Sequence, residues 1–173
     1  SDITDQKNIS TELIKEEVFG LWFDHGNRPK DASYAYIVVP DVDEHTVKET
    51  SVNNRDIVVL ANTPEIQGVK SRKTNICQLA FYKAGEIEIS ENKRVRIDSQ
   101  GMIILHFKGD DIFKITVADP SRKVNKMIIT IPGLYEPDSD LVETAQDGDG
   151  KSTRVIIDLP QGVYAGKSVA IGL

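Results

Sequence analysis

The sequence predicts an all-β protein made of antiparallel β-sandwiches, with one short helix near residues 42–50. Short apolar runs recur along the chain, and turn residues separate them about every 8–12 residues, which is typical of sandwiches. Two of the runs, residues 86–90 and 94–98, alternate between apolar and charged side chains, as half-buried strands do. With 173 residues, the chain can bury a sizeable core in one domain or in two small ones.

The first half of the chain contains four candidate strands and the helix. Runs rich in aromatic and branched residues predict the strands, over residues 16–25, 32–40, 56–62 and 75–85. Asp41 or Asp43 can cap the helix, and acidic residues in its first turn suit the helix dipole. The stretch 11–17 fits either a second helical segment or the edge of a strand.

The second half predicts strands throughout. A hairpin loop at 90–93 joins the two alternating strands, and the continuous apolar run 102–108 suits a strand covered on both faces. Residues 112–119 should place Phe113, Ile115 and Val117 on one face. Further strands are expected over residues 126–132, 153–160 and 168–173.

A polar, basic stretch at 63–75 predicts a boundary between two units. It contains Pro64 and Gly68, and few of its residues are of types that enter a core. We therefore expect the units to comprise residues 1–72 and 73–173.

Charge and composition exclude several classes of function. The formal net charge of −6 argues against a nucleic-acid partner, and no apolar run approaches the length of a membrane span. The single cysteine, Cys77, excludes an internal disulfide and a cysteine-based zinc site, and its apolar surroundings indicate a buried thiol.

No cofactor or metal site is predicted. The histidines His25, His45 and His106 do not have a metal-ligand spacing, and the acidic stretch 136–149 lacks the order of a calcium loop, so we expect it to form a hairpin turn. Asp24 could orient His25, or it could make hydrogen bonds within the turn that follows. No nucleophile–base arrangement can be identified, and no catalytic residue is assigned.

Two segments resemble polysaccharide lyase family eight, the chondroitin, hyaluronate and xanthan lyases. Residues 22–40, WFDHGNRPKDASYAYIVVP, resemble a family signature in which a strand ends and a short helix follows. Residues 101–121 are similar to a strand region of the family's C-terminal domain, which runs into a turn, here Ala118–Ser121.

The resemblance implies that residues 1–72 end the family's central super-sandwich and that residues 73–173 form its C-terminal β-sandwich. The parent would be a secreted, periplasmic or cell-surface bacterial lyase that cleaves uronic-acid-containing polysaccharides such as glycosaminoglycans by β-elimination. The family's catalytic residues lie upstream of the matched region. This piece is thus expected to be inactive alone and to support the substrate cleft.

Two alternatives remain open. The chain could be an independent carbohydrate-binding module, for which Trp22, His25 and Arg28 are the candidate contact residues, or an immunoglobulin-like spacer or adhesion module. In the lyase interpretation the first unit is part of a larger sheet with open edges, so self-association of the isolated chain is expected.

Overall fold

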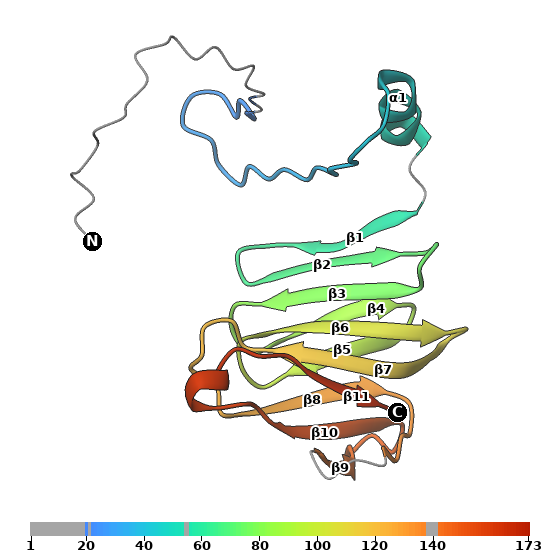
Figure 1. The fold of residues 1–173 in the computed structure, drawn as a ribbon, viewed down its shortest axis with the longest axis vertical. Helices are drawn as coiled ribbons and strands as arrows, with labels where there is room; N and C mark the ends of the chain where they lie inside the picture. Colours follow the sequence, from blue (N-terminus) through green and yellow to red (C-terminus); the bar gives the residue numbers. More distant parts are fainter. Residues whose placement is uncertain (1–19, 21, 54–55, 138–141) are drawn as a thin grey trace, which may run out of the picture. The chain divides into compact units, whose positions relative to one another are not determined.

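A computed structural model describes residues 20, 22–53, 56–137 and 142–173, and it divides the chain into two compact units, residues 1–38 and 39–173 (Figure 1). The described residues of the first unit form no strand or helix. The second unit contains the helix α1 (Glu44–Asn53) and every strand that the described residues form.

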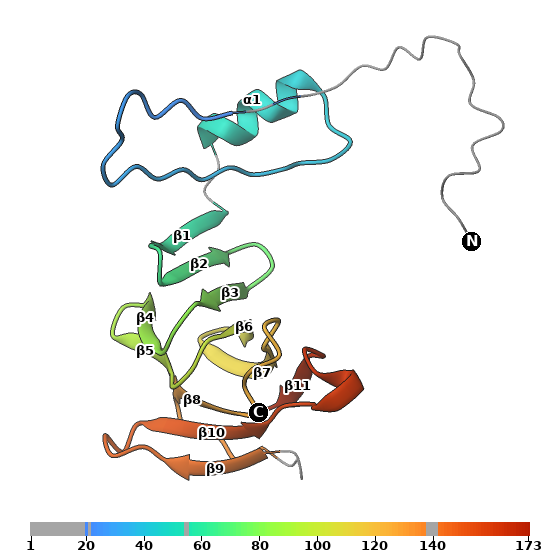
Figure 2. The ribbon, with the colours of Figure 1, turned by 90° about the vertical axis from the view of Figure 1, so that its left-hand side faces the viewer.

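Two antiparallel sheets make up the sandwich of the second unit. Sheet A has six strands, in the spatial order β1 (Ile57–Asn62), β2 (Ile66–Ser71), β3 (Ile76–Phe81), β6 (Gly101–Lys108), β7 (Asp111–Ala118) and β11 (Val169–Gly172). Sheet B has five, in the order β4 (Gly85–Ser90), β5 (Lys93–Ile97), β8 (Lys126–Pro132), β10 (Ser152–Asp158) and β9 (Val142–Gln146). Figure 2 shows β10 and β9 side by side at one end of the sandwich.

The core lies between the two sheets and is built by alternate residues of each strand. Leu105 and Ile115 project from sheet A, and Ile129, Ile131 and Ile157 project from sheet B, all of them fully buried. Because successive side chains of a strand point to opposite faces, this alternation leaves one face of each sheet outside the core. The predicted all-β, antiparallel sandwich is confirmed.

The helix is also confirmed, and it is displaced from the expected range by a few residues. Of the two candidate caps, Asp43 is the one used: its Oδ1 accepts a hydrogen bond from the Thr46 backbone N–H at 2.8 Å. That contact satisfies one of the donors that every helix N-terminus leaves free. No helix among the described residues is long and apolar enough to cross a membrane.

Two expectations about β6 and β7 are wrong. Phe113 is 46% exposed, because a β-bulge near Phe107 shifts the register so that Ile112 turns into the core instead. The strand β6 is buried on one face only, with residues such as Met102 on an outer face.

The polar stretch 63–75 contains a strand that sequence reasoning missed. Gly68 in β2 lies where the sheets approach closely, since a Cβ atom there would be 2.7 Å from Cδ1 of Ile87. The Asp56 carboxylate accepts hydrogen bonds from the Ser71 hydroxyl and the Lys73 backbone N–H, which holds the end of β2. The predicted division at residues 72 and 73 falls in the turn between β2 and β3, and the position of the domain boundary stays a prediction.

The strand expected over residues 32–40 is not formed, and neither is the described part of the strand expected over residues 16–25. A strand is defined by pairing with a neighbour, and these residues have no such ladder among the described part of the chain. Residues 16–19 and 21, and the stretch 11–17, lie outside the described residues. Two short elements were missed: β9, which lies inside the acidic stretch 136–149, and the 3₁₀ turn Gly162–Tyr164. The hairpin turn predicted in that stretch is present at 147–150.

Candidate functional site

Four rings of the first unit gather into an aromatic cluster, which comprises Phe23, His25, Tyr34 and Tyr36. Phe23 and Tyr34 are stacked with ring centroids 4.7 Å apart, and Tyr36 lies 6.1 Å from Phe23 and 6.3 Å from Tyr34. The His25 ring stacks on Tyr34 at 6.1 Å. The segments 22–25 and 34–36 therefore lie next to each other, joined by the turn between them.

The turn is held by Asp24 and by left-handed backbone. Oδ1 of Asp24 accepts a hydrogen bond from the Gly26 backbone N–H at 2.8 Å, and Gly26 has φ +72°. Arg28 and Asp31 also have positive φ values, of 56° and 54°. Asp24 thus makes the local turn contact that was one of its two expected roles.

The three candidate carbohydrate-binding residues lie in this segment. His25 belongs to the aromatic cluster, Arg28 is exposed in the turn, and the Trp22 side chain is 81% exposed. Sequence reasoning missed the grouping of Phe23 with the two tyrosines. The signal for it was the spacing of Tyr34 and Tyr36, which puts both rings on one face of an extended segment.

The segment 34–39 is apolar on both faces. Tyr34, Tyr36 and Val38 alternate with Ala35, Ile37 and Val39, and the large side chains among them are all exposed in this structure. Extended segments with apolar residues on both faces normally lie in sheets that are covered on both sides. The pattern of residues 34–39 is therefore typical of a strand inside a covered sheet.

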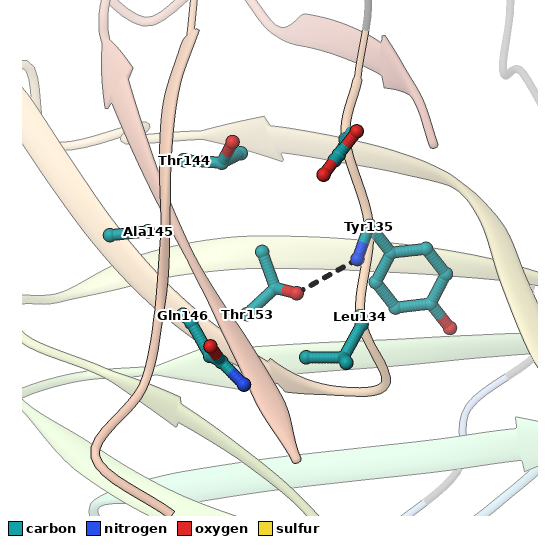
Figure 3. Close-up of a pocket in the computed structure, with 7 residues that line it drawn as sticks. Leu134, Tyr135, Thr144, Ala145, Gln146 and Thr153 are labelled. Carbon is teal, nitrogen blue, oxygen red and sulfur yellow. Dashed lines mark hydrogen bonds between the residues drawn. The ribbon is translucent and has the colours of Figure 1, made fainter. Parts of the chain in front are cut away.

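A hollow of about 480 Å³ opens beside β9 in the second unit (Figure 3), and two of the residues that line it make hydrogen bonds within the fold. The Thr153 hydroxyl donates to the Gly133 carbonyl at 2.8 Å and accepts from the Tyr135 backbone N–H at 3.0 Å. The Tyr135 hydroxyl in turn accepts a hydrogen bond from the Ile112 backbone N–H at 3.1 Å. Of these contacts, the one between Tyr135 and Ile112 joins the segment after β8 to β7 of sheet A.

Ion pairs cover the outer face of sheet B. Arg94 contacts Glu86 at 2.7 Å and Glu88 at 3.3 Å, and Arg96 contacts Asp147 at 2.9 Å. The charges of Arg94 and Arg96 are therefore balanced by carboxylates, so these two residues create no strongly positive surface for a polyanion.

The surroundings of Cys77 and of the two remaining histidines indicate structural roles for these residues. Cys77 is fully buried, and burial raises the pKa of its thiol to about 12, although nearby Lys70 acts in the opposite direction. A thiol with that pKa is protonated near neutral pH and is not a nucleophile. His106 meets Phe113 edge-on at 6.0 Å, and exposed His45 lies 3.8 Å from Glu49. Among the described residues, no group of three or more His, Cys, Asp or Glu side chains could hold a metal ion.

Comparison with known proteins identifies relatives for both halves of the chain. Residues 1–51 match the super-sandwich domain of polysaccharide lyase family 8, and residues 58–127 match the C-terminal β-sandwich domain of the same family. Chondroitinase-AC of Pedobacter heparinus is 31% identical over 94% of this chain, which spans 21% of that enzyme's length.

Solved structures agree with this assignment. A chondroitinase AC lyase solved with oligosaccharides superposes with a TM-score of 0.66 at 31% identity, over 84% of this chain and 19% of that one. A Streptomyces coelicolor chondroitin AC lyase, solved in complex with chondroitin sulphate, shares the fold with a TM-score of 0.67 at 18% identity, over 86% of this chain and 19% of that one. The chain thus spans about a fifth of the length of these proteins. By its sequence matches and its fold, the chain belongs to polysaccharide lyase family 8, and it corresponds to the C-terminal part of that family's proteins.

Proposed function

We propose that this chain is the non-catalytic C-terminal part of a lyase that cleaves uronic-acid-containing polysaccharides by β-elimination, and that it supports the substrate cleft. The observation that carries the proposal is the segment 34–39, which is apolar on both faces and lies in the part matched to the super-sandwich domain. Such a segment is stabilised by neighbouring strands on both sides, so its natural role is to complete a larger sheet. The glycosaminoglycan partner is proposed for the whole enzyme, as its relatives suggest.

The chemistry of β-elimination explains why support alone can matter. A base removes the C5 proton of the uronic acid, an acid protonates the leaving oxygen, and a neutralised carboxylate stabilises the charge that develops. Each group must hold its place to within a fraction of an ångström, so the walls of the cleft must be rigid. We place those groups upstream of residue 1 and the rigid wall in this chain. A secreted, periplasmic or cell-surface location is part of the same proposal, because the polymeric substrates are extracellular.

An assay of unsaturated-uronate absorbance tests this proposal. The isolated chain should give no turnover with chondroitin or hyaluronan, whereas the complete gene product should be active. In light scattering, the same isolated sample should show self-association through its exposed apolar segment 34–39. Robust turnover by the isolated chain, or an inactive complete gene product, would contradict the proposed function, and a clean monomer at high concentration would contradict the self-association.

A second candidate function, a carbohydrate-binding surface, is favoured by the aromatic cluster. Its stacked rings are partly exposed, and exposed rings can stack on sugar faces, with Trp22, His25 and Arg28 as further contacts. Calorimetry with chondroitin oligosaccharides tests this candidate. If it holds, Trp22→Ala or Arg28→Ala should weaken binding about tenfold, as expected for the loss of a stacking or charged contact. Tyr164→Ala is the control, since Tyr164 is an exposed ring of the second unit. No heat of binding, or an equal loss in the control, would argue against this function.

A further inference from the structure

Two loops lie against each other at the end of the sandwich where β7 finishes and β11 begins. One is the turn 119–125, which leads to β8, and the other is the loop 159–168, which contains the short 3₁₀ turn drawn in red in Figure 1. A Cβ atom on Gly166 would lie 3.4 Å from Cγ and 3.5 Å from Nε of Arg122, so the Arg122 side chain runs along the backbone of the other loop. The two loops therefore form one surface.

This surface has an excess of positive charge. Residues 120–126 and 159–173 contain no acidic residue, although the whole chain has a net charge of −6. Their cationic residues are Arg122, Lys123, Lys126 and Lys167. Lys126 contacts Asp158 at 3.4 Å, whereas the other three cations are exposed and form no ion pair within the described part of the chain. We call Arg122, Lys123 and Lys167 the basic patch.

The acidic groups near the basic patch do not neutralise it. Asp119 is buried, and its carboxylate accepts backbone N–H groups of the turn, so its oxygens face the backbone rather than the cationic side chains. Gln100, which contacts the Ser121 hydroxyl, is uncharged, and Asp98 directs its Oδ1 to the Ile128 backbone N–H of sheet B at 2.9 Å. Three unpaired cations against one buried carboxylate leave the surface positively charged.

Arg122 has a backbone conformation that is costly for an arginine. Its φ is +60°, in the left-handed region, where glycine is favoured and a long side chain is uncommon. Strained residues of this kind are found at functional sites, so an arginine at a position that suits glycine points to a use of its side chain. The contact with Gly166 also restricts the guanidinium before any ligand arrives, which lowers the entropic cost of binding.

We propose that the basic patch binds the uronate or sulphate groups of an anionic polysaccharide. This inference rests on the proposed function, because the polysaccharide is the polyanion that the complete enzyme would meet. A guanidinium forms paired hydrogen bonds with planar or tetrahedral oxyanions, and the two lysines supply point charges beside it. The net negative charge of the chain disfavours a broad anionic surface such as a membrane, whereas a small patch suits a flexible strand whose charges are spaced along it.

Calorimetry of this chain with chondroitin sulphate at low salt tests the basic patch. Arg122→Gly removes one charge and fits the left-handed backbone, so it should weaken binding about fivefold, as expected for one charged contact, without lowering the melting temperature. Arg122→Lys, which keeps the charge, should retain most of the affinity. Lys126→Ala is the matched control: it changes the net charge equally but removes a cation already paired with Asp158, so it should change the affinity less than about twofold.

Salt and alternative ligands provide further readouts. Raising the salt from about 50 mM to about 500 mM should weaken the binding of chondroitin sulphate at least about tenfold, since exposed charges are screened. Uncharged dextran should not bind. Equal losses in Arg122→Gly and Lys126→Ala would overturn the basic patch, because they would show that only net charge matters. Tighter binding to vesicles of anionic lipid than to chondroitin sulphate would overturn the assignment of the ligand.

The outcomes separate this inference from the proposed function and from the aromatic cluster. An active complete gene product, together with binding by this chain that ignores Arg122→Gly, would overturn the basic patch and leave the proposed function standing. Binding that depends on the basic patch, together with an inactive gene product, would support the patch and contradict the proposed function. Loss of all binding in Trp22→Ala, with Arg122→Gly as tight as the parent, would overturn the basic patch in favour of the aromatic cluster.

Discussion

Replacing Asp119 with alanine is expected to lower the free energy of unfolding by about 3 kcal/mol, since hydrogen bonds to a buried charge are among the strongest in proteins. The side chain is only 3% exposed. Its carboxylate accepts backbone N–H groups from Ser121 at 3.0 Å, Lys123 at 2.7 Å and Val124 at 2.8 Å. Alanine would leave all three donors without this acceptor in the turn that joins β7 to β8. Urea denaturation of both proteins measures the loss.

Asp149 provides a matched control for Asp119. Its carboxylate also accepts backbone N–H groups, from Lys151 at 2.7 Å and Ser152 at 2.9 Å, but the residue is exposed. Water can replace the lost acceptor there, so Asp149→Ala should cost clearly less than Asp119→Ala. Equal losses in the two variants would show that burial of Asp119 adds nothing.

The effect of Asp119 should also depend on pH. Burial raises the pKa of this carboxyl, but the hydrogen bonds from Ser121, Val124 and Lys123 outweigh burial, and the net pKa lies below the ordinary value of 3.8. A carboxyl with a lowered folded-state pKa stabilises the fold fully above the unfolded-state pKa, and this contribution is lost as the pH falls through the folded-state value. The stability difference between wild type and Asp119→Ala should therefore be largest near neutral pH and shrink at acid pH. A constant difference down to about pH 2 would contradict the assignment.

The local sequence pattern was sufficient to predict the sandwich, because the alternation of apolar and polar residues in a strand indicates which of its side chains are buried. In β4 and β5, isoleucine and valine alternate with glutamate and arginine, and the structure buries Ile87, Ile89, Val95 and Ile97 as that pattern indicates. In β11, Val169 and Ile171 are likewise buried. Where the period of two holds without interruption, the sequence alone predicts both the strand and its inner face.

Features set by tertiary contact were not predictable. The bulge that turns Phe113 outward depends on the register between β6 and β7, which no single strand encodes. The strand β2 resembles a linker because its glycine and polar residues suit a turn, yet Gly68 is needed where Ile87 and Leu79 crowd the backbone. For the candidate site, Trp22, His25 and Arg28 follow from residue type, whereas the stacking of Phe23 on Tyr34 requires the turn between them.

Two truncations that differ by one hairpin should differ greatly in stability. A chain of residues 56–173 keeps both sheets and should unfold cooperatively, with a melting temperature near that of the whole chain, because every fully buried apolar residue in the described part of the chain lies within it. A chain of residues 73–173, which starts at the predicted domain division, loses β1 and β2. It should be less stable on the order of 4 kcal/mol, as expected when several apolar side chains lose their burial, and it should aggregate.

The expected loss of stability follows from the core residues that β1 and β2 cover. Leu60, Ala61 and Ile66 pack against the core, and Gly68 lies over Ile87 and Leu79. Without them, β3 becomes an exposed edge strand, and part of its inner face, including Leu79 and Phe81, meets water. Thermal unfolding followed by circular dichroism, together with light scattering, compares the two truncations. If residues 73–173 proved as stable and monomeric as residues 56–173, the hairpin would belong energetically to the preceding domain, and the division at residues 72 and 73 would hold. If only the longer truncation folds, the C-terminal domain must include β1, the strand in which the family match begins at residue 58.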